Sequence, residues 1–179
     1  MSKEVASPDV LRKILRYEPH TGKLFWLFRN GDMFPDTGYG GAEGAASRWN
    51  ARFAGKEALI AINARYFRGS IFGQRVSSHR VIWAMQTGSW PTEEIDHINC
   101  DGLDNRWVNL REAKREENCW NRRMGKSNKS GFKGVSWDDG LKTWTATIRA
   151  RLGRFDTPEG AADAYARASA ILHGAFGRT

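Results

Sequence analysis

The sequence predicts an α+β protein built from several small units, and three observations support this. Short strand-like runs and short helix-like runs alternate along all 179 residues. Glycine-rich stretches separate them, most clearly at residues 30–47 and 125–134. The composition, 40% hydrophobic and 27% charged, is typical of a soluble globular chain. This length suits one ordinary domain or two small ones.

The chain is basic, with a net charge of +8 and a pI near 9.8, which favours a polyanionic partner. The excess is uneven, because residues 1–110 hold 14 basic and 12 acidic residues while residues 111–179 hold 14 and 8. No apolar run approaches the ~18 residues of a membrane span, and the N-terminus lacks the apolar segment of a signal peptide. We therefore expect no membrane partner.

The two cysteines, Cys100 and Cys119, are not part of any CxxC pair. This excludes a four-thiolate structural zinc site. We expect both to be reduced thiols in a cytoplasm.

The stretch Met1–Arg16 is predicted to contain a helix, with Ser7 as N-cap and Pro8 at the first helical position. A turn at 17–22 ends the helix, and His20 is interpreted as a turn residue rather than a ligand. The aromatic run at 23–29 predicts a strand.

Residues 30–47 are predicted to form a long loop, followed by strands at 48–53, 58–63 and 66–72. Aromatic residues in these strands are interpreted as core residues, with base stacking as the alternative. Arginines alternate among them, which favours a small antiparallel sheet with a basic outer face.

Residues 78–88 predict a helix that begins at a serine and closes at Gly88. His79 and Arg80 lie in its first turn and could reach phosphate or an active site. The alternative is that His79 is a structural residue of the helix start.

A group of polar residues at the centre of the chain suggests metal-dependent phosphodiester chemistry. Asp96 can give a hard anionic oxygen to a cation such as Mg²⁺. His97 can take a proton from water near neutral pH. Asn109 could orient the His97 ring, and the carbonyl oxygen of Asn118 could be a second metal ligand.

Side chains of adjacent strand residues point to opposite faces, so we expect a turn or strand end just after Asp96 and His97. Five turn-forming residues follow within eight positions: Asn99, Asp101, Gly102, Asp104 and Asn105. The run at 111–121 has no Gly or Pro and predicts a helix that returns Asn118 toward Asp96.

Asp96-His97-Ile98-Asn99, the stretch at 104–111 and Glu117-Asn118 together resemble the HNH nucleases, most of all their phage and intron-encoded homing branch. The resemblance implies a ββα-metal hairpin with Asp96 and Asn118 as ligands of one divalent ion, Mg²⁺ or Mn²⁺. It implies His97 as general base and Asn109 as its orienting partner. Asn118 stands where the family name expects His, and a neutral ligand binds a metal less tightly. The sequence at 22–26 and the helix start at 78–80 also occur in similar phage endonucleases.

The stretch from Cys119 to Gly134 predicts a flexible basic linker, since it is rich in Gly, Ser and Asn and holds no acidic residue. Its positive charges fit tracking along a DNA groove, with a solvated tether as the alternative. These charges are Arg122, Arg123, Lys126, Lys129 and Lys133.

Residues 131–179 predict strands followed by one helix, capped by Asp156 or Thr157 and stopped at Gly174. This region resembles the plant ethylene-response-factor (APETALA) DNA-binding domain, which implies that Thr147, Arg149 and Arg151 contact DNA. Ser136 and Asp138 stand where plant members carry arginines. Only Ala150 and Arg151 separate the second strand from Leu152-Gly153, so we expect the third strand to be incomplete.

We therefore divide the chain into an N-terminal DNA-contacting region (1–77), an HNH nuclease core (78–122), a basic linker (123–130) and a DNA-binding module (131–179). The expected function is metal-dependent hydrolysis of double-stranded DNA by a monomeric, phage-encoded homing endonuclease in the cytoplasm of a bacterial host. The alternative is a non-catalytic DNA-binding regulator that uses the C-terminal module. A structured RNA partner is a third possibility.

Overall fold

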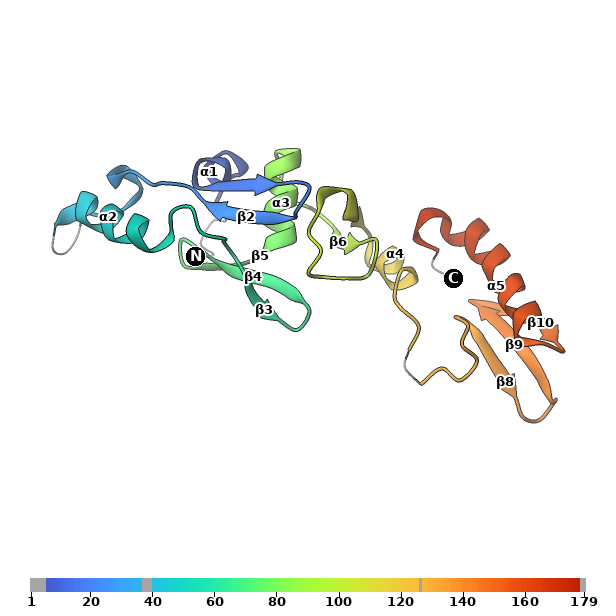
Figure 1. Ribbon diagram of the computed structural model, residues 1–179. Helices are drawn as coiled ribbons and strands as arrows, with labels where there is room; N and C mark the ends of the chain where they lie inside the picture. The colour runs from blue at the N-terminus through green and yellow to red at the C-terminus, as the bar shows by residue number, and fades with distance from the viewer. Residues whose placement is uncertain (1–5, 37–39, 126, 178–179) are drawn as a thin grey trace. The chain divides into compact units, whose positions relative to one another are not determined.

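The computed structural model describes residues 6–36, 40–125 and 127–177, and the chain divides into two compact units, Met1–Glu112 and Ala113–Thr179 (Figure 1). Small antiparallel sheets and helices make up the described residues, which confirms the α+β class. The finer division into four segments stays a prediction.

The first unit opens with helix α1 (Pro8–Ile14), which begins where the sequence predicts. Ser7 caps it by accepting a hydrogen bond from the Val10 N–H. The helix ends earlier than expected, since strand β1 (Leu15–Glu18) follows at once and pairs antiparallel with β2 (Lys23–Trp26). Leu15 continues the apolar helical spacing of the sequence, and strand pairing overrides it.

The predicted loop at 30–47 is wrong from residue 41 onward, and residues 37–39 of it lie outside the described residues. The strand predicted at 48–53 is wrong. After a 3-10 turn η1 (Gly31–Met33), helix α2 (Gly41–Phe53) occupies most of this stretch. Its sequence is rich in alanine, a strong helix former. Trp49 and Phe53 are four residues apart, so they share one helix face with ring centroids 5.3 Å apart.

A three-stranded antiparallel sheet of β3 (Ala61–Asn63), β4 (Tyr66–Ile71) and β5 (Gln74–Ser77) follows. It leads directly into helix α3 (Ser78–Thr87), which Gly88 closes at φ 82° as predicted.

Strands β6 (Glu94–His97) and β7 (Leu110–Ala113) then form a two-stranded sheet, with a 3-10 turn η2 (Trp107–Asn109) before β7. The helix predicted at 111–121 is therefore partly wrong, because its first residues extend β7 and only α4 (Arg115–Trp120) is helical.

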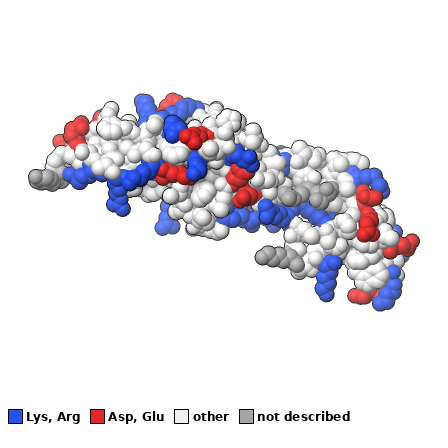
Figure 2. Space-filling view, in the orientation of Figure 1, with Lys and Arg blue, Asp and Glu red and all other residues white. Residues whose placement is uncertain are grey.

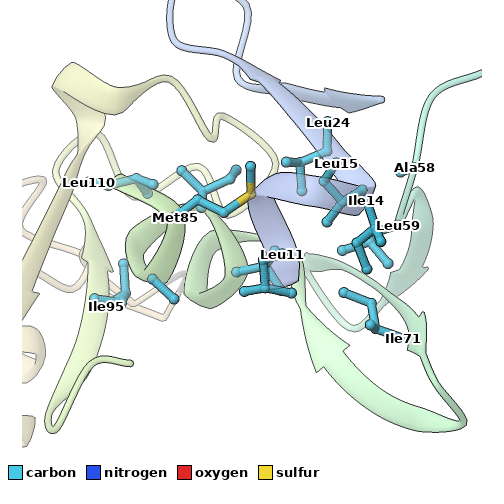
Figure 3. Packing of buried hydrophobic residues seen from close by; sticks show 13 residues of the cluster. Leu11, Ile14, Leu15, Leu24, Ala58, Leu59, Ile71, Met85, Ile95 and Leu110 are labelled. Carbon is cyan, nitrogen blue, oxygen red and sulfur yellow. The ribbon is translucent and has the colours of Figure 1, made fainter. Parts of the chain in front are cut away.

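One hydrophobic core holds the first unit together (Figure 3). Leu11 and Ile14 of α1 pack with Val81 and Ile82 of α3, all fully buried. Ile95 of β6 joins the same cluster. The hairpin that carries Asp96 and His97 is thus built on the N-terminal region.

The second unit contains α4 and a three-stranded antiparallel sheet in the order β10-β9-β8. Its strands are β8 (Val135–Asp138), β9 (Thr143–Ile148) and β10 (Ala150–Phe155). Helix α5 (Pro158–His173) packs on this sheet through Ala161 and Tyr165 and is followed by a 3-10 turn, η3 (Gly174–Phe176). Thr157 is the cap of α5, since its side chain accepts from the Gly160 N–H.

The expectation of an incomplete third strand is wrong, because β10 pairs with β9 along its length. The connection is short because Arg149 adopts φ 57°, so the chain reverses within one residue. The pairing of β10 with β9 shifts by one residue between Arg151 and Gly153, as in a β-bulge.

Candidate active site

The candidate site lies where β6 ends and the chain loops back to β7. The Ile98 N–H donates to the Asn109 carbonyl at 2.9 Å, which closes the loop at its base. Asp104 organises the loop by accepting from Asn99 Nδ2 at 2.8 Å and from Arg106 Nε at 2.8 Å. The hydrogen bond from Arg106 lowers the pKa of Asp104 to about 2, so this carboxylate stays charged.

His97, the last residue of β6, is buried with 4% of its surface exposed. Its Nε2 lies 2.9 Å from Asn105 Oδ1, and Asn105 is itself only 2% exposed. With the amide oxygen facing the ring, Nε2 carries the proton and Nδ1 keeps its lone pair. Burial lowers the pKa of His97 below its ordinary value, although Asn105 and Asp96 act in the opposite direction. The imidazole is therefore neutral near pH 7.

The predicted orienting role of Asn109 needs correction, because its amide is used within the loop. Asn109 Nδ2 donates to Asn99 Oδ1 and to the Asp104 carbonyl, while its Oδ1 accepts from the Asn99 N–H. The turn η2 places this side chain against the loop backbone. Asn109 shapes the loop, and Asn105 holds the ring.

Asp96 precedes His97 in β6 and is 5% exposed. Its Oδ2 accepts from Arg111 Nε at 2.8 Å, and Arg111 Nη2 lies at the same distance. Arg111 belongs to β7, so strand pairing positions the guanidinium that fixes this carboxylate.

Two further rings surround His97. His79, at the start of α3, lies 5.2 Å from it between ring centroids, and Tyr66 of β4 lies 5.7 Å from it. His79 is 8% exposed, and burial lowers its pKa to about 3. Its Nδ1 finds no hydrogen-bond partner among the described residues. His79 therefore contributes a neutral ring next to His97.

Arg80 contacts the backbone before β6, and its reach to phosphate stays a prediction. Its guanidinium donates to the carbonyls of Pro91 and Glu93 at 2.9 and 3.0 Å. It fixes the segment that leads into β6.

Asn118 lies in α4, in the second unit, so the pair of predicted metal ligands is divided between the two units. The backbone N–H of Asn118 donates to the Lys114 carbonyl within the first turn. In the described part of the chain, no group of three or more His, Cys, Asp or Glu side chains is placed to hold a metal ion. The ligand role of Asp96 and Asn118 stays a prediction.

The predicted DNA-contacting residues differ in their exposure and in their contacts within the chain. Figure 2 shows Lys and Arg on the drawn face of both units. Arg122, Arg123 and Lys129 are exposed, while Lys126 lies outside the described residues. Lys133 Nζ donates to the Trp120 carbonyl, which connects the segment before β8 to α4.

On the module itself, Thr147 is exposed. The Arg149 guanidinium lies 5.2 Å from the Trp120 ring centroid, and Arg151 lies 3.9 Å from the Asp138 carboxylate. These two cations thus have contacts within the unit besides any with DNA.

Sequence reasoning missed Asn105 and Arg111. The sequence predicts a turn role for both Asp104 and Asn105. Asp104 does hold the loop, whereas the Asn105 side chain contacts the His97 ring. Arg111 was assigned to a helix. Arg111 could have been found if residues 110–113 had been predicted as a strand. It would then lie on the strand that pairs with the one that carries Asp96.

Comparisons with known proteins place part of the chain near a nuclease family. Residues 76–119 match the family model described as HNH endonuclease. The chain is similar to a curated protein of Escherichia phage T7, "Protein 3.8", with 40% identity over 73 residues. That match covers 40% of this chain and 60% of the phage protein. No solved structure matches. Within the described residues, no helix is long and apolar enough to cross a membrane.

Proposed function

We propose that this chain is a metal-dependent DNA endonuclease of the HNH type, which hydrolyses phosphodiester bonds. The observation that supports this best is the buried His97 held by Asn105, next to Asp96 held by Arg111. Both pairs lie inside the stretch that matches the HNH endonuclease family.

In the proposed reaction, His97 is the general base. Its neutral Nδ1 takes a proton from a water molecule whose oxygen attacks phosphorus. The bond from phosphorus to the 3′ oxygen breaks with the electron pair on that oxygen, which takes a proton from solvent water. The products are a 5′-phosphate and a 3′-hydroxyl. The hydrogen bond to Asn105 keeps Nε2 protonated and so leaves Nδ1 as the basic nitrogen.

The donor chemistry of the site fits a hard divalent cation, Mg²⁺ or Mn²⁺. Asp96 offers a carboxylate that Arg111 holds in one orientation. The amide oxygen of Asn118 is a proposed second ligand on the strength of the family resemblance alone. Mg²⁺ is usually bound by one or two such groups together with water and substrate phosphate. When bound, the ion would stabilise negative charge on the leaving 3′ oxygen.

Contacts outside the site would hold double-stranded DNA. The N-terminal region, Arg122 and Arg123, and the sheet of the second unit offer positive charge and exposed polar side chains. We propose that the second unit binds DNA as an ethylene-response-factor-like module, with Thr147, Arg149 and Arg151 facing DNA. Its three-stranded sheet with one packed helix supports this proposal. Because no two-fold half-sites are required, we propose a monomer.

The similarity to a phage T7 protein supports a phage-encoded enzyme that acts in the cytoplasm of a bacterial host. The homing role rests on the resemblance of the motifs at 96–118 to the phage and intron-encoded branch. A non-catalytic DNA-binding regulator has no use for His97, Asn105, Asp96 and Arg111 together, so the site geometry favours the nuclease.

The proposal is tested on supercoiled plasmid carrying the DNA that flanks the protein's own gene, with Mg²⁺, Mn²⁺ or EDTA. We expect relaxed circle with metal only, which DNA ligase reseals because the nick has a 5′-phosphate and a 3′-hydroxyl. If the plasmid stays intact under all conditions but the protein still shifts the DNA on a gel, the chain is a non-catalytic DNA-binding regulator. A shift of structured RNA but not of the plasmid would indicate an RNA partner.

A further inference from the structure

The turn between β1 and β2, residues 19–22, lies directly against the backbone that carries Asn105. The Trp107 N–H donates to the Pro19 carbonyl at 3.1 Å. The Tyr17 hydroxyl donates to the Asn105 carbonyl at 2.8 Å. A segment more than 80 residues earlier in the chain thus contacts the residue that holds the His97 ring.

Gly22 makes the closest approach of this turn. A Cβ atom at Gly22 would lie 2.6 Å from the backbone carbonyl carbon of Asn105 and 2.6 Å from the backbone nitrogen of Arg106. Both neighbours are backbone atoms, so no side-chain rotation could relieve the overlap. Gly22 also has φ +76°. A larger residue here must therefore displace either the turn or Asn105.

We propose that the β1–β2 hairpin is a positioning element for the general base, acting through Asn105. This inference rests on the proposed nuclease function and extends the catalytic machinery beyond the 76–119 stretch. Tyr17 and Gly22 are positioning residues, because they act on Asn105, whose side chain contacts His97.

The geometry shows why the hairpin affects the ring. Asn105 is almost fully buried and held at both ends, by Tyr17 at its carbonyl and by His97 at its side chain. A hydrogen bond of 2.9 Å weakens when its atoms move apart by a few tenths of an ångström. Burial raises the pKa of the Tyr17 hydroxyl, so it stays protonated and remains a donor.

The chain offers a matched control for Gly22→Ala. Gly55 has the same φ of +76°, and nothing lies within 4 Å of a Cβ placed there. Gly22→Ala and Gly55→Ala therefore share the cost of a left-handed alanine and differ in the clash with Asn105. We expect Gly22→Ala to lower kcat for plasmid nicking by roughly 10- to 100-fold with little change in KM. Gly55→Ala should keep the wild-type kcat.

Tyr17→Phe is the milder second variant, because it removes one hydroxyl and leaves the ring. We expect kcat to fall by about 5-fold, the loss of one hydrogen bond. The second readout does not depend on catalysis: ¹⁵N chemical shifts of the His97 ring in the full chain at pH 8. The wild-type ring should be almost entirely the Nε2–H tautomer, and Gly22→Ala and Tyr17→Phe should populate the Nδ1–H tautomer.

Equal kcat losses in Gly22→Ala and Gly55→Ala, or an unchanged His97 tautomer in both hairpin variants, would overturn the inference. Failure of the proposed function looks different: the wild-type protein would not nick DNA, while the tautomer would still respond to Gly22→Ala. In that case the hairpin positions the ring without a catalytic purpose, and the catalytic inference falls as well.

Discussion

The surroundings of His97 favour the neutral imidazole that a general base requires. Because burial lowers its pKa below the ordinary value near ~6.5, cleavage should survive at pH values where an exposed histidine would be largely protonated. Activity falls as the pH drops through the folded-state pKa. We expect the acid limb of the single-turnover rate, measured between pH 4.5 and 8, to have its midpoint below ~6.5. A midpoint above that value would contradict the burial argument.

His79 should make the first unit sensitive to acid. Its pKa is lowered to about 3 in the folded chain, whereas an unfolded histidine titrates near ~6.5. Below that pH the unfolded state binds a proton that the folded state does not, so stability falls with falling pH down to about 3. The unfolding free energy of the wild-type chain should therefore drop between pH 7 and pH 5. We expect this drop to be smaller by about 2 kcal/mol in His79→Phe.

Urea unfolding at the two pH values measures this difference. The control is His20→Gln, because His20 is exposed in the turn between β1 and β2. If His79→Phe and the wild-type chain lose the same free energy on acidification, His79 is not the acid-sensitive group.

At the level of elements, the start of β8 in the second unit depends on one glycine. A Cβ atom at Gly134 would overlap the Tyr165 ring of α5, and its φ is +71°. Gly131 has a similar φ of +78° and nothing within 4 Å. Gly134→Ala should therefore destabilise the unit by about 3 kcal/mol, and Gly131→Ala by about 1 kcal/mol.

Amide hydrogen exchange separates the two units in this experiment. Protection of β8, β9 and β10 should fall in Gly134→Ala and stay near the wild-type level in Gly131→Ala, while α3 is unchanged in both. Equal protection of β9 in the two variants would show that Tyr165 can move aside.

The elements also show what the sequence could predict. α1, α3 and α5 were predicted because caps and apolar spacing are local signals: Ser7 and Thr157 cap α1 and α5, and Gly88 closes α3. α2 was missed because its glycines resemble a loop. β7 was predicted as helix because Arg111, Glu112 and Ala113 are good helix formers, and the pairing with β6 is a long-range contact.

The candidate site divides in the same way. Asp96 and His97 were identified from residue chemistry, and the structure buries both. The partners Asn105 and Arg111 were missed because each depends on the loop and strand geometry that brings it back to β6. Tyr17 lies 88 positions from Asn105, and no local pattern marks such a contact.

At the level of the whole chain, the positive charge should govern DNA affinity. Each phosphate contact made by a Lys or Arg steepens the salt dependence of binding, with a slope of about −0.9 per contact in a plot of log K against log salt. Arg122→Ala with Arg123→Ala should make the slope shallower by about 1.8. The charge-conserving pair Arg122→Lys and Arg123→Lys should leave it unchanged. Identical slopes in all three proteins would place these two arginines away from DNA.

The most direct test of the central claim compares the wild-type chain with His97→Ala in single-turnover nicking at saturating DNA and Mg²⁺. Binding of the same DNA is measured in EDTA. Loss of the general base should lower the nicking rate by roughly 10²- to 10⁴-fold while DNA affinity is retained. A His97→Ala protein that nicks at the wild-type rate would contradict the assignment of His97 as the base.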